Sequence, residues 1–445
     1  MLLKLKGLAQ DLPEPFARPL VMIPYAWRLG RRYAKARRDI ARFPTLGEAE
    51  QEAFIFARVR RAVGQVLAKN EFYRWFYGKH NFSIDRLREF KDIQEVPVVN
   101  KSDLQAWKLE RRSVPVPGRF RVNTGGTSGQ PLEFYATREV FANEWAHMHH
   151  VWRRVGYRQT DLKLTFRGKD LGARTVRFNP VHNELVVNAY HPQELVAGEL
   201  LKALERRRVR YLHGYPSTLY EIASYCLSAA PALLDQLRGS LRGVLLGSEC
   251  PLPAYREVIE RAFPVPSISW YGHSEMGVLA YEAKRPLEYV PLQTYGHAEA
   301  VTQPDGSRRL VATTYFNRAS PFIRYDTGDE ITPLNDGKIL GAFRMASGRA
   351  GDFVVDRHGQ RVSLTALIFG RHHEAFGSAE FVQIRQSEPG RATILVVPAT
   401  GKVLAADEWA RLFDFRNVEL TVDYEVRERP VRTPAGKTPL LVRNS

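Results

Sequence analysis

The chain has little cysteine. Its 445 residues include only Cys226 and Cys250. So few thiols exclude a disulfide framework and a four-cysteine zinc site. The sequence therefore favours a reducing compartment, and we expect a cytoplasmic protein.

Long apolar runs and an excess of acidic residues are also missing. No apolar stretch approaches the roughly 20 residues that cross a bilayer, and the N-terminus lacks a signal-peptide pattern. Lysine and arginine number 65 against 48 acidic residues, a formal charge of +17. This balance indicates anionic partners, such as nucleotides, coenzyme A, anionic glycans or a membrane surface, without choosing among them. A solvated basic face is the alternative.

Residues 16–38 combine apolar side chains with arginines. Phe16 and Trp27 belong to an apolar segment that leads into a run of basic residues. This pattern is typical of a peripheral membrane anchor, but Pro19 and Pro24 oppose one smooth amphipathic helix. The alternative is an N-terminal arm packed on the body of the protein.

Residues 121–135, RVNTGGTSGQPLEFY, gather glycines and hydroxyls in one loop. Neither GxxxxGK[ST] nor GxGxxG occurs there, so two common phosphate motifs are excluded. Glycines let backbone amides approach an anion, and successive amides can form an anion-binding nest. The stretch therefore predicts an oxyanion loop, with a surface turn as the alternative.

The middle of the chain alternates expected strands and helices. Strands are predicted at 162–167, 184–190, 209–212, 241–246 and 267–270, with helices between them, which indicates a largely parallel sheet. Polar clusters at 213–217, 247–249 and 271–275 follow three of these strands. Because ligands bind beyond the carboxyl ends of parallel strands, we expect these clusters to meet.

The flanking regions are simpler. Residues 47–76 predict one helix, Asn100 or Ser102 a helix N-cap, and Asp305-Gly306 a hairpin turn. His147, His149 and His150 lack accompanying carboxylates, so a metal site there is not favoured. Residues after about 352 predict a small α+β unit.

Five motifs in order carry a resemblance: TGGTSGQP, YGHSE, RYDTGD, SGR and a C-terminal TPAGK. This order resembles the adenylate-forming superfamily, and most of all its phenylacetate–CoA ligase and capsular-polysaccharide (CapK-like) branch. The resemblance implies a large N-terminal α/β domain of parallel and mixed sheets with helices, and a small α+β C-terminal domain. We expect an N-terminal basic arm at 1–45, a nucleotide- and acyl-binding domain at 46–348, and a small mobile domain at 349–445.

The resemblance also implies roles for individual residues. Lys437 would bridge the carboxylate and the α-phosphate, and Glu275 would hold Mg²⁺. Tyr271 would lie against adenine, Ser274 would touch the α-phosphate, and Asp329 with Arg349 would bind the ribose. The phosphate loop would be Thr124, Gly125, Gly126, Thr127, Ser128 and Gly129, and the rest of the nucleotide pocket Gly247, Ser248, Glu249 and Gly272. The acyl group would meet His213, Tyr215, Trp270, His273 and Met276, which favour an aromatic or medium-sized apolar acid.

The implied function is an ATP- and Mg²⁺-dependent ligase that forms an acyl-adenylate from a small carboxylic acid. The acceptor would be coenzyme A, or a sugar amine or hydroxyl in polysaccharide assembly, and no nucleic acid is expected. Gly351 and Ser363 replace residues that the family uses around its hinge, and Tyr281 to Ala283 lack the cysteines of some relatives. A degenerate scaffold and a protein that binds anionic surfaces are therefore the alternatives.

Overall fold

The computed structural model describes residues 16, 19–123, 132–169, 171–335, 337–346, 353–364, 367–368, 371, 373–399, 402–431 and 440–442. Within these ranges, no helix is long and apolar enough to cross a membrane.

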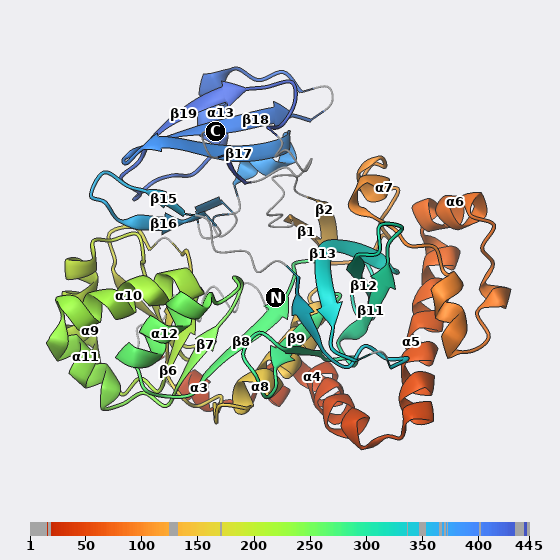
Figure 1. The fold of residues 1–445 in the computed structure, drawn as a ribbon, viewed down its shortest axis with the longest axis horizontal. Coiled ribbons are helices and arrows are strands. Elements are labelled where there is room, and N and C mark those ends of the chain that lie inside the picture. Colours follow the sequence, from red (N-terminus) through yellow and green to blue (C-terminus); the bar gives the residue numbers. More distant parts are fainter. Residues whose placement is uncertain are drawn as a thin grey trace.

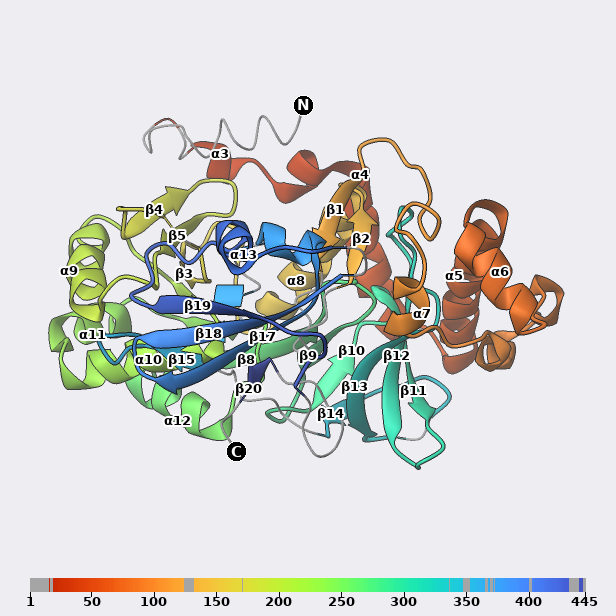
Figure 2. The same cartoon turned by 90° about the horizontal axis from the view of Figure 1, so that it is seen from above.

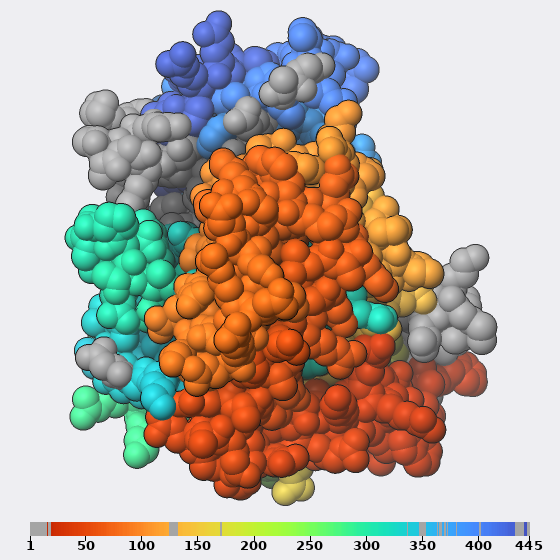
Figure 3. Space-filling view, turned by 90° about the vertical axis from the view of Figure 1, so that its right-hand side faces the viewer, coloured from red at the N-terminus to blue at the C-terminus, as the bar shows by residue number. Residues whose placement is uncertain are grey.

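Residues 19–105 form helices and connecting segments and cover much of one side of the molecule (Figure 3). The prediction of a single helix over 47–76 is wrong, because Asn70 divides it. The Asn70 side chain accepts a hydrogen bond from the Tyr73 amide at 3.2 Å and donates to the Arg112 carbonyl at 2.9 Å, so it caps a new helix. Asn100 caps the short helix predicted after it. The helices are α3 (Pro19–Met22), α4 (Tyr25–Arg42), η1 (Phe43–Thr45), α5 (Glu48–Lys69), α6 (Glu71–Lys79), η2 (Ile84–Arg86), η3 (Phe90–Glu95) and α7 (Lys101–Gln105).

A large mixed sheet forms the centre of the protein (Figure 1). In the described part of the chain it has twelve strands, in the order β11-β12-β13-β14-β10-β9-β8-β7-β6-β3-β5-β4. One half contains the predicted parallel strands, with β4 antiparallel at its edge. Its strands are β3 (Lys163–Phe166), β4 (Val176–Asn179), β5 (Glu184–Val187), β6 (Tyr211–Gly214), β7 (Gly243–Leu246) and β8 (Ser267–Gly272).

The other half of the sheet is antiparallel and begins where β8 pairs with β9. The predicted hairpin at Asp305-Gly306 joins two of its strands. Its strands are β9 (Leu279–Glu282), β10 (Tyr289–Pro291), β11 (Gly296–Thr302), β12 (Arg308–Thr314), β13 (Tyr325–Pro333) and β14 (Phe343–Met345). A separate hairpin, β1 (Phe120–Asn123) with β2 (Glu133–Ala136), brackets the predicted phosphate loop.

Helices cover the parallel half and form its core with it. Leu164, Leu212 and Val244 of the strands pack with Leu200, Leu219 and other apolar residues of the helices. The helices are α8 (Glu139–Arg153), α9 (Gln193–Leu204), α10 (Pro216–Ser228), α11 (Pro231–Arg238) and α12 (Pro253–Ala262).

The C-terminal part has its own sheet and its own core around Trp409. This sheet lies over the parallel half of the large sheet (Figures 1 and 2). The elements are β15 (Phe353–Val355), β16 (Arg361–Ser363), η5 (Glu374–Gly377), β17 (Ala379–Glu388), β18 (Arg391–Pro398), α13 (Ala406–Leu412), β19 (Thr421–Val426) and β20 (Leu441–Val442). The predicted fold class is confirmed. The exact domain limits stay a prediction, since residues 347–352 lie outside the described ranges.

Candidate nucleotide and acyl site

Eight of the predicted site residues lie outside the described residues, and their roles stay predictions: Thr124, Gly125, Gly126, Thr127, Ser128, Gly129, Arg349 and Lys437. The strands that flank the loop 124–131 are antiparallel, with Asn123 opposite Glu133. The remaining predicted residues lie at or just after the carboxyl ends of β6, β7 and β8, except Asp329, which lies in the middle of β13.

Tyr271 and Asp329 come from strands β8 and β13 and meet in one hydrogen bond. The Tyr271 hydroxyl donates to Oδ2 of Asp329 at 2.7 Å. Burial raises the pKa of Tyr271 well above its ordinary value, and the neighbouring Asp329 carboxylate raises it further, so the phenol stays protonated and donates. The second carboxylate oxygen of Asp329 is not used by this bond.

A bulge in β13 brings Asp329 to this position. Between the paired residues Val311–Asp326 and Arg309–Glu330, β13 has more residues than β12, so the segment 327–329 bulges out of the ladder. Gly328 has a φ of +78°, which favours glycine because other side chains are strained there. The Asp329 amide donates to the Thr327 hydroxyl at 3.2 Å, which fixes the turn.

Glu275 is held in the turn that follows β8. The Val278 amide donates to Nε2 of His273 at 2.9 Å, so the ring proton lies on Nδ1 and is donated to Oε2 of Glu275 at 3.0 Å. The Tyr325 hydroxyl donates to Oε1 at 3.1 Å. Both ring nitrogens of His273 are therefore engaged, and this residue positions Glu275.

Glu275 is ionised although it is buried. Burial acts to raise its pKa, but the hydrogen bond from His273, a backbone hydrogen bond and the charge of Lys101 together outweigh burial, so the pKa is lowered. Lys101 is brought close because Val99, just before α7, bridges to Tyr325. A carboxylate held ionised in this way has the donor chemistry that Mg²⁺ prefers. Among the described residues no cluster of three or more metal-binding side chains occurs, so Glu275 would share the ion with phosphate oxygens and water.

Gly247, Ser248 and Glu249 connect the ends of the neighbouring strands. A side chain at Gly247 would place its Cβ 2.2 Å from the Trp270 ring, so only glycine fits. Ser248 has a positive φ of 69°. Oε2 of Glu249 accepts a hydrogen bond from the Ser217 amide, at the start of α10, at 3.1 Å. The three predicted polar clusters thus lie side by side along one edge of the sheet.

The predicted acyl site has an aromatic wall. The His213 ring lies 5.9 Å from the Trp270 ring and 5.1 Å from that of Trp152. Burial, and then the charge of Arg167, hold the pKa of His213 well below its ordinary value, so the ring is neutral. Its Nδ1 is buried and makes no hydrogen bond with the described residues. Met276 packs between two of the apolar clusters beside this wall.

Sequence reasoning did not select five further residues near the site: Lys101, Glu144, Trp152, Arg167 and Tyr325. Tyr325 lies inside the RYDTGD motif and offers the clearest signal. Arg167 comes directly after β3, just as the polar clusters come directly after their strands. This position in the sequence is the signal that could have marked it as a site residue. It influences Glu144, whose pKa is raised by burial and lowered in part by a hydrogen bond from Tyr295 and by Arg167.

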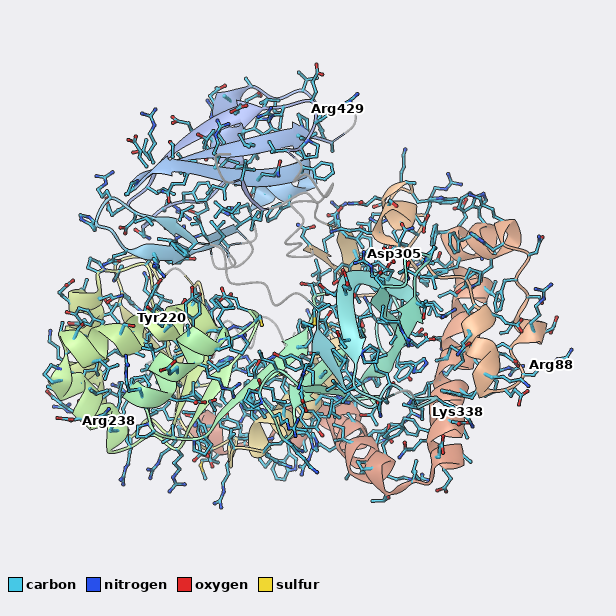
Figure 4. The ribbon with its side chains drawn as sticks, in the orientation of Figure 1. Arg88, Tyr220, Arg238, Asp305, Lys338 and Arg429 are labelled. Atoms are coloured by element: carbon cyan, nitrogen blue, oxygen red, sulfur yellow. The ribbon has the colours of Figure 1, made fainter. Side chains whose placement is uncertain are left out.

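The C-terminal part meets the large domain at α10, where Tyr220 lies below β16 (Figure 4). Glu221, the next residue, has its pKa raised to about 8 by burial. Glu249 and Asp356 act in the same direction and Arg361 opposes them.

Comparison with known proteins agrees with the fold. No family model matches the chain. The chain is 26% identical over 307 residues to phenylacetate-coenzyme A ligase of Escherichia coli (strain K12), covering 61% of this chain and 65% of that one. It is 22% identical over 299 residues to protein CapK of Staphylococcus aureus, covering 65% of each. The alignments thus span a little under two thirds of each relative's length.

A solved structure of 2-hydroxyisobutyryl-CoA ligase with 2-HIB-AMP and CoA has a TM-score of 0.57 to this chain, at 17% identity, covering 91% of this chain and 92% of the other. The same ligase in the postadenylation state has a TM-score of 0.54, again at 17% identity, covering 91% and 92%. The structural similarities confirm the predicted fold, and the two sequence relatives agree with the predicted resemblance to phenylacetate–CoA ligase and CapK.

Proposed function

We propose that this protein activates a small carboxylic acid with ATP and transfers the acyl group to coenzyme A. The observation that carries the proposal is the Tyr271–Asp329 hydrogen bond beside an ionised Glu275. Two separate motifs predict that these residues bind the adenosine and the metal. Tyr271 lies at the end of β8, Glu275 follows in the next turn, and Asp329 lies beside Tyr271 on β13. The relationship to a phenylacetate-coenzyme A ligase supports the reaction class.

The nucleotide would lie across the carboxyl ends of β7 and β8 and the bulge of β13. The free oxygen of Asp329 would accept hydrogen bonds from the ribose hydroxyls, while Tyr271 holds the carboxylate in place and offers its ring to adenine. The backbone of Gly247 and Ser248 would line the adenine pocket. Lys437 and the loop 124–129 would hold the phosphates.

The first reaction is attack by a carboxylate oxygen on the α-phosphorus of ATP. A new P–O bond forms, the bond from the α-phosphorus to the bridging oxygen breaks, and pyrophosphate leaves with the electron pair. Two anions must meet, so cations and amide donors have to offset the charge. Mg²⁺ bound at Glu275 would supply part of that positive charge, and Lys437 would supply another part.

In the second reaction the thiol of coenzyme A attacks the acyl carbonyl. A C–S bond forms, the C–O bond to phosphate breaks, AMP leaves, and the thiol proton passes to solvent. The acid would lie against Trp270, the partly exposed ring of this wall, with the buried Trp152 and His213 behind it, which agrees with the expected aromatic or medium-sized apolar acid. A hydrogen-bonding group on the acid would find the unpaired Nδ1 of His213.

A sugar amine or hydroxyl is the second candidate acceptor, because the chain is similar to protein CapK. With this acceptor, the amine or hydroxyl attacks the same acyl-adenylate, and an amide or ester forms in place of the thioester. Residues 16–38, the expected membrane contact, lie on a different part of the molecule.

The test is ATP–pyrophosphate exchange driven by a panel of carboxylic acids. We expect exchange with at least one acid, and its loss in Lys437→Ala and Asp329→Ala. Glu330→Gln is the matched control, because Glu330 is a carboxylate on the same strand. Mass spectrometry of the product then separates a coenzyme A thioester from a glycan amide or ester. If no acid drives exchange and mass spectrometry detects no acyl-adenylate, the alternative of a catalytically degenerate scaffold is favoured.

A further inference from the structure

The N-terminal segment exposes large apolar side chains in one place. Phe16 is 74% exposed, Met22 72%, and Trp27 81%, with Ile23 beside them at 38%. Elsewhere in the described chain, only Val403 among the large apolar residues exceeds 70%. The hydrophobic effect opposes such a cluster in water, so a surface of this kind marks a contact with another apolar phase or partner.

Residues 21–28 of this segment are fixed on the protein. The Arg28 guanidinium donates to three carbonyls: Val21 at 3.2 Å, Ile23 at 2.7 Å and Val181 at 2.8 Å. The Tyr25 hydroxyl donates to the same Val181 carbonyl at 3.0 Å. Met22, Ile23 and Trp27 are therefore presented by an ordered backbone, and little further ordering is needed when they bind.

Cations continue from the apolar cluster along α4. After the break at Gly30, Tyr33, Ala36 and Ile40 are buried against α8. Arg31, Lys35, Arg38 and Arg42 are exposed and follow the opposite face at helical spacing.

More arginines lie along the amino edge of the parallel strands, where α3 and the start of α4 are attached. Exposed Arg158, Arg208 and Arg242 precede β3, β6 and β7. The pKa of Arg210 is lowered first by desolvation and then by the neighbouring charges of Arg208 and Arg242, so cations are close together here. Side chains that end in nitrogen project from this lower edge (Figure 4).

We propose that this basic-apolar face, made of Phe16, Met22, Ile23, Trp27 and the adjoining cations of α4 and the amino edge, binds the surface of a bilayer that contains anionic lipids. Tryptophan and other apolar side chains enter the headgroup boundary, and arginine and lysine meet the lipid phosphates. Nucleic acid would match the cations but not the exposed methionine and isoleucine. A second copy of this chain would bring the same positive charge to the contact, and like charges repel.

This orientation leaves the candidate site free. Tyr271, His213 and Gly247 lie at the carboxyl ends of their strands, while the basic-apolar face lies at the amino ends. In Figure 1, α3 is at the lower edge and the C-terminal sheet at the upper edge. A lipid-bound molecule would therefore keep its nucleotide site and its C-terminal part in water.

The test is co-sedimentation of the full chain with vesicles of phosphatidylcholine alone, and of equal parts phosphatidylcholine and phosphatidylglycerol. We expect binding to the anionic vesicles only, and weaker binding as salt is raised. Met22→Ser with Trp27→Ser should lower the vesicle affinity at least tenfold. Arg31→Gln and Lys35→Gln should each lower it roughly fivefold.

The matched control is Lys402→Gln with Val403→Ser, an exposed cation and an exposed valine on the C-terminal part. This variant should bind vesicles as the native chain does. Because all these side chains are exposed, the variants should fold, and circular dichroism checks this. The proposal is overturned by equal binding to neutral vesicles, by no binding to either kind, or by an equal loss in the control. Retention of DNA or self-association that depends on Trp27, without vesicle binding, would also overturn it.

Discussion

Removing the Tyr271 hydroxyl tests how the candidate nucleotide site is built. Tyr271→Phe keeps the ring against Phe343 and deletes a 2.7 Å hydrogen bond to the Asp329 carboxylate. Hydrogen bonds to charged groups contribute about 1.5–3 kcal/mol. ATP binding should lose only part of this free energy, because the Asp329 carboxylate is still present and only becomes more mobile. We therefore expect the Kd for ATP to rise about three- to thirtyfold.

A double-mutant cycle separates this role from a direct one. In an Asp329→Asn background the hydroxyl has no carboxylate to hold, and Tyr271→Phe should then change the Kd for ATP by less than about twofold. Isothermal titration calorimetry measures all four proteins. Tyr289→Phe is the control: its hydroxyl bonds to Ser269 at 3.1 Å in the same sheet, and its loss should leave ATP affinity unchanged. If Tyr271→Phe weakens ATP equally in both backgrounds, the reasoning is wrong.

Three further changes have expected results. Glu275→Gln should raise the Mg²⁺ concentration for half-maximal exchange at least tenfold, and calorimetry with ATP should show the same rise; an unchanged Mg²⁺ requirement would contradict the metal role. Glu221→Gln should raise the free energy of unfolding by about 1–2 kcal/mol above pH 8 and by nothing near pH 4.5. The pKa of Glu221 is about 8 in the folded protein against 4.5 ordinarily, so the native protein loses stability as pH rises through that window, as urea titrations at both pH values would show. Gly247→Ala should cost about 1–3 kcal/mol and lower Tm, because its Cβ would lie 2.2 Å from the Trp270 ring, whereas Gly198→Ala on α9 has open space and should be neutral or stabilising.

Local patterns predicted the parallel half of the sheet well. The fully buried Gly243–Leu246 strand and its polar continuation at 247–249 show how a short apolar run followed by a turn marks a strand and its carboxyl end. Local patterns do not predict the break at Asn70, because apolar residues continue on both sides of it. The break depends on a bond to the Arg112 carbonyl, 42 residues away, and helical periodicity has no access to that contact.

The site was harder to predict than the fold. Tyr271 and Asp329 are separated by 58 residues, and Glu275 and Tyr325 by 50. Only the resemblance brought the first pair together beforehand. Lys101 and Arg167 belong to no motif. Lys101 lies near the site because Val99 pairs with Tyr325, and Arg167 because it follows the end of β3. Such contacts depend on sheet order, which local propensity does not determine.

The two edges of the parallel strands are electrostatically separate. Strand β3 has four residues, and at about 3.3 Å per residue its first and last residues lie roughly 10 Å apart. This exceeds the Debye length of about 8 Å at physiological salt, so exposed cations at the amino edge contribute little to ATP binding at the carboxyl edge. The excess of cations behind the net charge of +17 therefore does not have to contribute to nucleotide binding. Arg31→Gln should weaken vesicle binding and leave the KM for ATP unchanged. Asp329→Asn should raise the KM for ATP and leave vesicle binding unchanged.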